Sequence, residues 1–371
     1  MRILHVVKSY QSVGGIERYV RDLVAKHRAR GHCVNILTVG TGRSLQVIDE
    51  EGGKIYFLPR LLTYQSATIS LQFPSLLLRL SRQHDIVHFH YPNPCGELSY
   101  LAISPFLRVP TITTFHNEVV PTKRFYRIYR PLGRRFLELM DRIIVTSPNQ
   151  LKTSAILQGL EEKTTVIPLG IPMPEMSPQS STSLFPPQAF PRILFVGRLS
   201  RYKGLPYLIE AMQSAPGHLL IVGDGPLRTR LEAQVRELGL EERIVFTGYV
   251  PEEILWRLYH EADILVLPSI DRGEGFGYVI LEAMAASTAI VSTELGTGTS
   301  YVNQHGETGF VVPKQDASAL AQAIRQLAED PDLLRKFKEK ARERVRRFFT
   351  LDQMVDKIEQ EYISLLEGRR R

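Results

Sequence analysis

A glycine-rich turn in the second half of the chain carries two glutamates. Glu274 and Glu282 are separated by seven residues, and Gly273, Gly275 and Gly277 surround the first of them. Glycine lets the backbone come close to a ligand, and free N–H groups where a helix begins favour a phosphate or a hydroxylated ligand. Carboxylates accept hydrogen bonds from paired sugar hydroxyls, so this spacing suits a ribose and a second sugar. The alternative is a turn with two solvated glutamates.

Two cations, Arg198 and Lys203, follow a predicted strand that leads into Gly197. Arginine offers a planar fork to phosphate oxygens and lysine a point charge, so together they can neutralise a leaving nucleoside diphosphate. For an isolated pair, the default interpretation is two surface cations.

Histidines end two predicted strands of the first half. His116 follows Thr-Thr-Phe at a strand end, where a histidine is more often structural or exposed than catalytic. His88 and His90 end another strand, with both imidazoles on one face. A metal pair there would lack a clear third and fourth ligand, so we prefer the lining of a cleft near an acceptor.

Taken together, the motifs resemble those of the retaining GT-B glycosyltransferases of family 4. The family's Glu-x7-Glu signature matches Glu274 and Glu282. Further motifs match at Gly14-Gly15, 166–170, 196–199, Lys203-Gly204 and 222–226. The resemblance covers nearly the whole chain. It implies an α/β fold of two Rossmann-like, doubly wound parallel-sheet domains that face each other across a cleft.

The resemblance also implies a role for each matched residue. Glu282 would bind the ribose hydroxyls, and Glu274 with the 275–277 backbone would bind the donor sugar. His116 would orient that sugar or assist electrostatically, without acting as a nucleophile. We therefore expect His116 and Glu274 to be catalytic, and the donor-binding residues to be Gly15, Arg198, Lys203, Gly275, Phe276, Gly277, Tyr278 and Glu282.

The implied reaction moves a sugar from a nucleotide-sugar to a hydroxyl with retention of configuration. GDP-mannose is the expected donor, because 294–304 resembles the same segment of mannosyltransferases of bacterial polysaccharide assembly; UDP-GlcNAc, UDP-Glc or UDP-Gal are the alternatives. We expect no metal and no other cofactor, since Arg198, Lys203 and backbone amides would supply the charge. Ser287 and Ala289 stand where the family usually has glycine and then proline, and we expect them to alter that turn.

Two other classes of protein remain as alternatives. A nucleotide-dependent oxidoreductase would need a complete dinucleotide fingerprint, but Arg228 stands where the third glycine is required. A non-catalytic nucleotide- or nucleic-acid-binding protein would explain the net charge of +7, but we find no recognised nucleic-acid-binding module. Nucleic acid is therefore not an expected partner.

Alternating strands and helices must position these residues, and such alternation builds parallel sheets covered on both faces. In the first half we expect strands at 3–7, 34–39, 54–58, 85–89, 111–115, 142–146 and 165–168, and helices at 16–30, 73–82, 96–106 and 148–159. In the second half we expect strands at 192–196, 218–222, 243–247, 263–267, 289–292 and 309–312, followed by helices at 317–329, 331–349 and 351–366.

This pattern predicts the domain organisation. Residues 1–170 form an acceptor-side domain, 171–191 a linker rich in proline and serine, and 192–350 the nucleotide-sugar-binding domain. Residues 351–371 are expected to be a helix that returns to the first domain. With 371 residues, 43% of them hydrophobic, the chain can bury two cores.

Cysteine content, hydropathy and charge predict the location. Two cysteines cannot form a disulfide framework, and no apolar run approaches the ~20 residues of a membrane span, so we expect a cytoplasmic protein. The basic, aromatic stretch 123–135 suits anionic lipid headgroups or a lipid diphosphate; a solvated basic face is the equal alternative. We expect Pro131 and Gly133 to interrupt its helix. A peripheral position on the inner membrane face and a lipid-diphosphate-linked saccharide acceptor follow, with candidate acceptor or cleft residues His88, His90, Lys123, Arg127 and Arg130.

Overall fold

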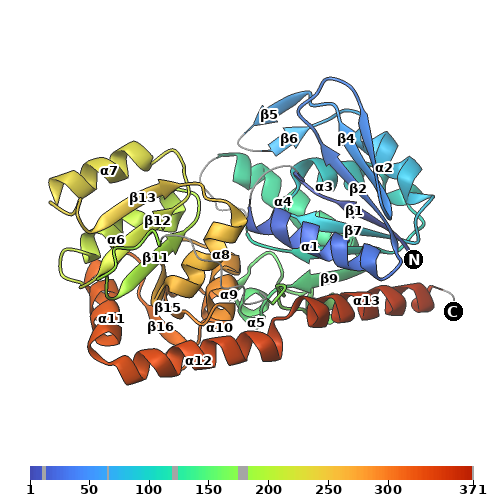
Figure 1. Cartoon of the computed structure of the whole chain (residues 1–371). Helices are drawn as coiled ribbons and strands as arrows, with labels where there is room; N and C mark the ends of the chain where they lie inside the picture. Colours follow the sequence, from blue (N-terminus) through green and yellow to red (C-terminus); the bar gives the residue numbers. More distant parts are fainter. Residues whose placement is uncertain (11–13, 65–66, 119–123, 174–182, 370–371) are drawn as a thin grey trace. The chain divides into compact units, whose positions relative to one another are not determined.

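The chain is described by a computed structural model that covers residues 1–10, 14–64, 67–118, 124–173 and 183–369 (Figure 1). It forms two compact units, Met1–Gly170 with Leu351–Arg371, and Ile171–Thr350. Each unit is an α/β structure built on its own sheet.

The first unit contains an eight-stranded sheet in the order β10-β9-β8-β7-β1-β2-β4-β3. Neighbouring strands are parallel except for β3 and β4. All seven strands predicted here are present; β3 was missed because its five residues are all exposed. The strands are β1 (Arg2–Val6), β2 (Cys33–Val39), β3 (Gln46–Glu50), β4 (Gly53–Leu58), β7 (Ile86–Tyr91), β8 (Thr111–Phe115), β9 (Arg142–Val145) and β10 (Thr164–Val166), beside an unpredicted hairpin of β5 (Leu62–Tyr64) and β6 (Ala67–Ile69).

One face of this sheet is apolar. Because side chains alternate along a strand, Leu4 and Val6 of β1 share a face with Phe89 of β7. Helices α2 (Phe73–Ser81), α3 (Pro94–Ile103) and α4 (Arg124–Leu139) cover that face (Figure 1). Their buried residues join the same core, namely Phe73, Leu76, Leu77, Leu80, Tyr100, Ile103, Tyr129, Phe136 and Leu137.

The opposite face carries histidines. His5 of β1 alternates with Leu4 and Val6, and His88 and His90 alternate with the apolar residues of β7. Helix α1 (Gly15–Ala29) covers this face with α13 (Leu351–Gly368), the last helix of the chain. Aromatic and imidazole rings of these two helices, from Tyr19, His27 and Tyr362, lie against the strand histidines.

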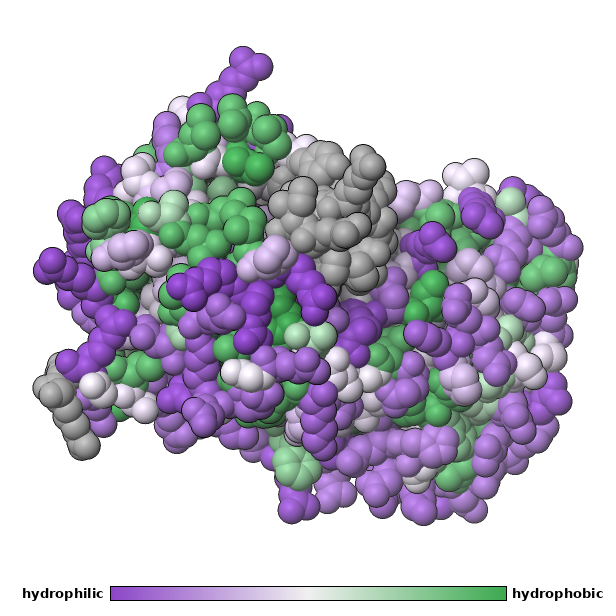
Figure 2. Space-filling view, turned by 180° about the vertical axis from the view of Figure 1, so that it is seen from behind, coloured by the Kyte–Doolittle hydropathy of each residue, from purple (hydrophilic) through white to green (hydrophobic). Residues whose placement is uncertain are grey.

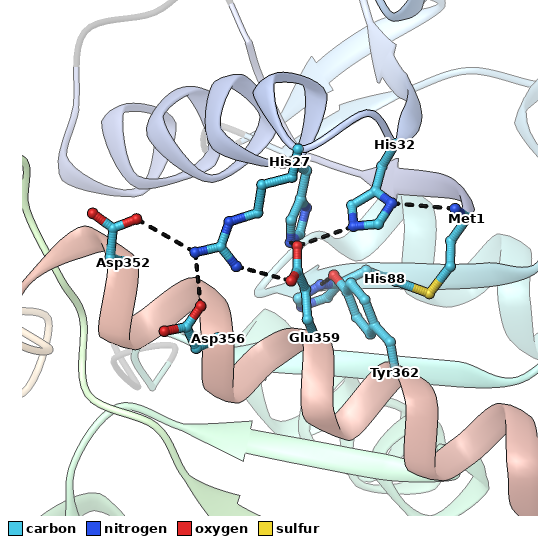
Figure 3. A network of polar contacts seen from close by, with 9 residues as sticks. Met1, His27, His32, His88, Asp352, Asp356, Glu359 and Tyr362 are labelled. Atoms are coloured by element: carbon cyan, nitrogen blue, oxygen red, sulfur yellow. Dashed lines mark hydrogen bonds and ion pairs between the residues drawn. The ribbon is translucent and has the colours of Figure 1, made fainter.

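Ion pairs join α13 to the end of α1 (Figure 3). Arg30 lies 3.3, 2.7 and 2.8 Å from the carboxylates of Asp352, Asp356 and Glu359. His32 lies 3.0 Å from Glu359 and 3.2 Å from the amino group of Met1. The last helix is therefore held to the first unit by charge as well as by buried rings.

Helix α4 corrects one expectation, because it continues through Pro131 and Gly133 without interruption. A proline inside a helix costs about 3 kcal/mol, and the buried face of Tyr129, Phe136 and Leu137 offsets that cost. Gly133 also packs closely against the sheet, since a Cβ there would lie 3.1 Å from the Tyr91 hydroxyl.

The second unit has a six-stranded, entirely parallel sheet in the order β13-β12-β11-β14-β15-β16. All its strands were predicted, with small differences at the ends. They are β11 (Arg192–Val196), β12 (His218–Val222), β13 (Ile244–Gly248), β14 (Ile264–Leu267), β15 (Ala289–Thr293) and β16 (Gly309–Val312). The helices are α6 (Leu205–Ala211), α7 (Arg228–Glu237), α8 (Glu252–Glu261), α9 (Tyr278–Ala285), α10 (Thr299–Val302), α11 (Ala317–Glu329) and α12 (Pro331–Phe348).

Part of the predicted linker 171–191 packs into the second unit. Phe185 and Ala189 are buried, and the Ser183 hydroxyl donates a 2.6 Å hydrogen bond to Glu261 of α8. Over the described residues, no helix is long and apolar enough to cross a membrane.

Candidate functional site

A buried ion pair forms the centre of the candidate site in the second unit. Lys203 ends a short 3-10 turn (Arg201–Lys203) after β11, and Glu274 lies in the loop between β14 and α9. The Lys203 ammonium donates a 2.7 Å hydrogen bond to Glu274 Oε2, and the Ser269 hydroxyl donates a second, of 2.9 Å, to the same oxygen. The structure thus brings together one predicted phosphate-binding residue and one predicted sugar-binding residue.

The ion pair keeps Lys203 charged. Burial alone would lower the pKa of Lys203, but the Glu274 carboxylate raises it above its usual value. Lys203 Nζ also lies beside Gly197, where a Cβ would be 3.4 Å away. A positive group is therefore held against backbone at the carboxyl end of β11, where ligands bind in parallel α/β sheets.

Glu282 lies inside α9 and is 3% exposed, while Glu274 is 8% exposed. Tyr259 of α8 donates a 2.7 Å hydrogen bond to Glu282 Oε2. The alternative of two solvated glutamates is therefore wrong. A buried carboxylate with a hydrogen-bonded orientation is suited to accepting bonds from fixed hydroxyls.

The glycine-rich turn has the backbone geometry that its composition predicts. Gly277 is the N-cap of α9 with φ +81°, a left-handed conformation that favours glycine. The segment that resembles mannosyltransferases packs on this turn, because Gly298 donates a 2.7 Å hydrogen bond to the Gly275 carbonyl. A Cβ on Gly298 would lie 2.6 Å from Phe276, which is itself buried, as is Tyr278.

Arg198 is exposed and lies in the loop after β11. Two glycines of the loop after β12 let that loop pack against the backbone on either side of Arg198. A Cβ on Gly223 would lie 2.2 Å from the Gly197 carbonyl oxygen, and a Cβ on Gly225 would lie 2.6 Å from the Leu199 carbonyl oxygen. The Leu199 N–H donates a hydrogen bond to the Asp224 carbonyl of this loop, and the Leu199 carbonyl accepts one from the Leu227 N–H. Close packing of the two loops therefore presents the Arg198 guanidinium to solvent.

The backbone angle of Ser287 bears on one departure from the family pattern. It has φ +62°, so the chain keeps a left-handed residue at the position where the family usually has glycine. We expected Ser287 to alter this turn, but its φ angle is one that glycine also adopts. A serine instead bears the steric cost that glycine would avoid.

In the first unit, His116 follows β8 and is 4% exposed. Its Nε2 lies 3.1 Å from His90 Nδ1, and its carbonyl accepts a 2.8 Å hydrogen bond from the Gln150 side chain. The Tyr19 ring stands edge-on to it at 4.9 Å between centroids. Burial lowers the pKa of His116 to about 3, so the imidazole is neutral near pH 7.

His88 corrects the expectation that it lines an acceptor cleft. It is fully buried, with Nδ1 2.6 Å from the Tyr362 hydroxyl (Figure 3) and Nε2 2.7 Å from Thr114 Oγ1. Both nitrogens are therefore used inside the first unit. His90 is buried as well, at 2% exposure, between His5 and His116.

His5 is the third histidine that the metal alternative lacked, because one nitrogen each of His5, His88 and His90 lie within 4.8 Å of one another. Both nitrogens of His88 and of His90, and Nδ1 of His5, already serve in hydrogen bonds, and the group contains no carboxylate to neutralise a buried cation. We therefore interpret the cluster as a hydrogen-bonded network.

Two predicted positions have limited structural description. Lys123 lies outside the described residues, as does the side chain of Arg127, whereas Arg130 is described and exposed on α4. Gly15 is the first residue of α1. Gly14, just before it, leaves room for the Glu17 side chain, because a Cβ on Gly14 would lie 2.4 Å from Glu17 Oε2.

Sequence reasoning missed several residues of both sites. Ser269 and Tyr259 hold the two glutamates but belong to no matched motif. The sequence does contain a signal for His5, because it is a histidine in an otherwise apolar strand. That strand, β1, pairs with β7, and their register puts His5 on the same face as His88 and His90.

Two Rossmann-like units, each built on a largely parallel sheet, define a GT-B glycosyltransferase fold. Family profiles agree: Glycosyltransferase Family 4 matches residues 13–173, and Glycosyl transferases group 1 matches residues 178–344. The chain belongs to glycosyltransferase family 4 and is a glycosyltransferase by that membership.

Relatives match along the whole chain. The O-antigen chain mannosyltransferase C of Escherichia coli is 31% identical over 373 residues, covering 100% of both chains. The D-rhamnosyltransferase WbpZ of Pseudomonas aeruginosa is 35% identical over 356 residues, or 94% of this chain and 92% of that one.

Solved structures show the same fold at lower identity. Sucrose-phosphate synthase of Thermosynechococcus elongatus has a TM-score of 0.79 at 24% identity over 99% of each chain. Anabaena HepE, solved in complex with UDP-glucose, has a TM-score of 0.77 at 19% identity over 98% of this chain and all of its own.

Proposed function

We propose that the protein transfers mannose from GDP-mannose, with retention, to a saccharide acceptor linked to a lipid diphosphate. The observation that carries the proposal is the pair of buried, oriented glutamates, Glu274 on Lys203 and Glu282 on Tyr259, in a family 4 chain. Relatives named as an O-antigen chain mannosyltransferase and as phosphatidyl-myo-inositol mannosyltransferases support mannose and polysaccharide or glycolipid assembly.

In this proposal the cations stabilise the leaving group. Arg198 is free to reach phosphate oxygens from solvent, and Lys203 supplies a charge next to the Gly197 backbone. Glu274 holds Lys203 and accepts hydrogen bonds from the sugar, while Glu282 accepts them from the ribose. Gly15 contacts the phosphates and His116 orients the sugar. The acceptor hydroxyl attacks on the face from which the diphosphate departs, and the diphosphate takes its proton.

No metal is required in this proposal. Arg198, Lys203 and the backbone N–H groups at the start of α9 would neutralise the charge that develops on the diphosphate. Activity that persists unchanged in EDTA would support this, and activity restored only by a divalent cation would contradict it.

The test is binding and hydrolysis of a panel of GDP- and UDP-sugars by the wild type, Glu282→Gln and the control Glu329→Gln, an exposed glutamate at the end of α11. We expect saturable use of GDP-mannose that is lost in Glu282→Gln and kept in the control. Preference for a UDP-sugar would replace the donor and leave the chemistry intact. Equal activity of the two variants would contradict the assignment of Glu282.

A UDP-sugar is the second candidate donor. The solved relative HepE holds UDP-glucose on the same fold, and the residues that we assign to the diphosphate do not distinguish the two bases. The same panel therefore decides between UDP-GlcNAc, UDP-Glc, UDP-Gal and GDP-mannose.

Association with an anionic membrane surface, and with it a cytoplasmic location at the inner face, is part of the proposal. Hydrophobic side chains gather over part of the surface of the first unit in Figure 2. Phe106 is 64% exposed and lines a surface pocket together with the exposed Arg82 and Arg108. An exposed aromatic ring between cations suits an interface of anionic headgroups.

Vesicle flotation tests this surface. We expect binding to vesicles with anionic lipid that weakens in high salt and in Arg108→Gln. The control Arg346→Gln changes net charge equally on the exposed side of α12 and should bind as the wild type does. Equal weakening in both variants would indicate only a general attraction of the basic protein.

A further inference from the structure

Three buried histidines of the first unit form one hydrogen-bonded chain. His116 Nε2 lies 3.1 Å from His90 Nδ1, and His90 Nε2 lies 3.0 Å from His5 Nδ1. The planes of these rings differ by 19° and 25°, and the ring centroids lie 5.4 and 5.3 Å apart. At these N–N distances such centroid separations mean that the rings meet end to end, as hydrogen bonds between imidazoles require. None of the three is more than 4% exposed.

Strand register produces the chain. His5 of β1 is the register partner of His88 on β7, so His90 lies two residues further along on the same face. His90 is in turn the partner of Thr114 on β8, and His116 lies two residues beyond Thr114, directly after the end of that strand. The three imidazoles therefore step diagonally across the sheet toward the carboxyl ends of its strands, where ligands bind in α/β folds.

All three rings are neutral near pH 7. Burial, with a smaller effect of the Arg28 charge, lowers the pKa of His5 to about 3. Burial also lowers the pKa of His116 to about 3 and that of His90 well below its usual value. Each ring then has one N–H and one lone pair. Because His90 has one donor and one acceptor, both hydrogen bonds must run in the same direction.

The two possible directions differ at the ends of the chain. If His5 donates to His90 and His90 to His116, the His116 proton is on Nδ1 and His5 Nε2 has a lone pair. In the reverse direction, His5 Nε2 has the proton. This nitrogen is buried without a hydrogen-bond partner in the described part of the chain. Neither end state satisfies this nitrogen, but a buried N–H without an acceptor is the rarer of the two in folded proteins, so the direction that leaves a lone pair on His5 Nε2 is favoured.

We propose that His5 and His90 are positioning residues that hold His116 in the Nδ1–H tautomer, so that His116 presents an N–H donor to its ligand. Nε2 of His116 is occupied by His90 and its carbonyl by Gln150, and Nδ1 has no partner among the described residues. The identity of the ligand rests on the proposed function, in which a hydroxyl oxygen of the donor sugar accepts this hydrogen bond. The tautomer itself does not depend on that function.

Nitrogen NMR of the full, ligand-free chain labelled with ¹⁵N-histidine measures the tautomer directly, because protonated and unprotonated imidazole nitrogens differ in chemical shift. The His116 signals are assigned by their loss in His116→Gln. We expect Nδ1 of wild-type His116 to carry the proton. A proton on Nε2 overturns the proposal without recourse to any variant of the chain.

Two matched variants test the cause. His90→Leu removes both hydrogen bonds, and we expect His116 to become a mixture of tautomers. His88→Leu removes a histidine from the same strand and face that is bonded to Tyr362 and Thr114 instead, and His116 should remain Nδ1-protonated. Retention of the Nδ1–H form in His90→Leu, or an equal change in both variants, would contradict the relay through His90.

Activity separates this inference from the proposed function. If the wild-type tautomer is Nδ1–H but His116→Gln hydrolyses the donor with unchanged kcat and KM, the tautomer inference stands and the proposed role of His116 fails. If kcat falls in His116→Gln while the wild-type proton is on Nε2, the function stands and the relay fails.

Discussion

The Lys203 ammonium lies 2.7 Å from the Glu274 carboxylate, and the two side chains are only 8% and 10% exposed. Removing one member leaves the other as a buried, unpaired charge, which costs far more than the pair itself contributes. Each member of the pair therefore depends on the other to remain charged in the interior of the second unit.

Lys203→Met should lower the free energy of unfolding by about 3–5 kcal/mol, as measured by urea denaturation. The control is Arg335→Met, which removes an exposed partner of Asp332 and should cost less than about 1 kcal/mol. A loss in Lys203→Met no larger than that of the control would show that the ion pair is not buried in solution.

Ser287→Gly should raise the stability by about 1 kcal/mol, because glycine adopts φ +62° without the penalty that serine bears. The matched control is Ser75→Gly on the exposed side of α2, where the same change should lower the stability by about 0.5–1 kcal/mol. Thermal unfolding of both variants gives the two signs. Destabilisation by Ser287→Gly would contradict the left-handed conformation.

Stability should fall as the pH is lowered from 6.5 toward 3. The pKa of His5 and of His116 is lowered to about 3, against 6.5 for an ordinary histidine, so the unfolded chain binds protons in this range that the folded chain does not. For each such histidine, the free energy of unfolding falls by about 1.4 kcal/mol for every pH unit below 6.5 and does not change above pH 6.5.

Urea midpoints at several pH values measure this slope. His27→Leu should reduce it, because the buried His27 also has its pKa lowered, to about 2, mainly by burial. A pH slope equal to that of the wild type would mean that His27 is protonated in the folded state.

Tyr362→Phe should cost about 1–3 kcal/mol, because it removes the hydroxyl 2.6 Å from His88 Nδ1 and leaves that buried nitrogen unsatisfied. The same change at Tyr249, which is 67% exposed, should be nearly neutral. Hydrogen exchange along α13 would show whether the loss is local. No difference between the two variants would contradict the contact between α13 and the histidine face.

Much of the fold follows from local patterns. Helix α11 has the bounds expected from its apolar periodicity, and every strand expected from an apolar run is present. The exceptions have physical causes. The exposed strand β3 has no buried face to leave a pattern, and α4 tolerates Pro131 because tertiary packing offsets a local penalty.

The buried polar residues of the candidate site were named from the sequence, but their hydrogen-bond partners were not. Glu274, Glu282, Lys203 and His116 were all named from the sequence, and all are buried. Their contacts with Ser269, Tyr259 and His90 were not foreseen, and His88 proved to face α13.

Sequence alone thus determined the α/β class, the order of the elements and the family, because periodicity, glycine turns and motif spacing are local properties of the chain. Only the tertiary structure decided that Lys203 meets Glu274 across 71 positions and that His5 joins His90 across 85. Such contacts depend on strand order, on register and on which face each side chain takes. These are set by the packing of the whole sheet and not by any one segment.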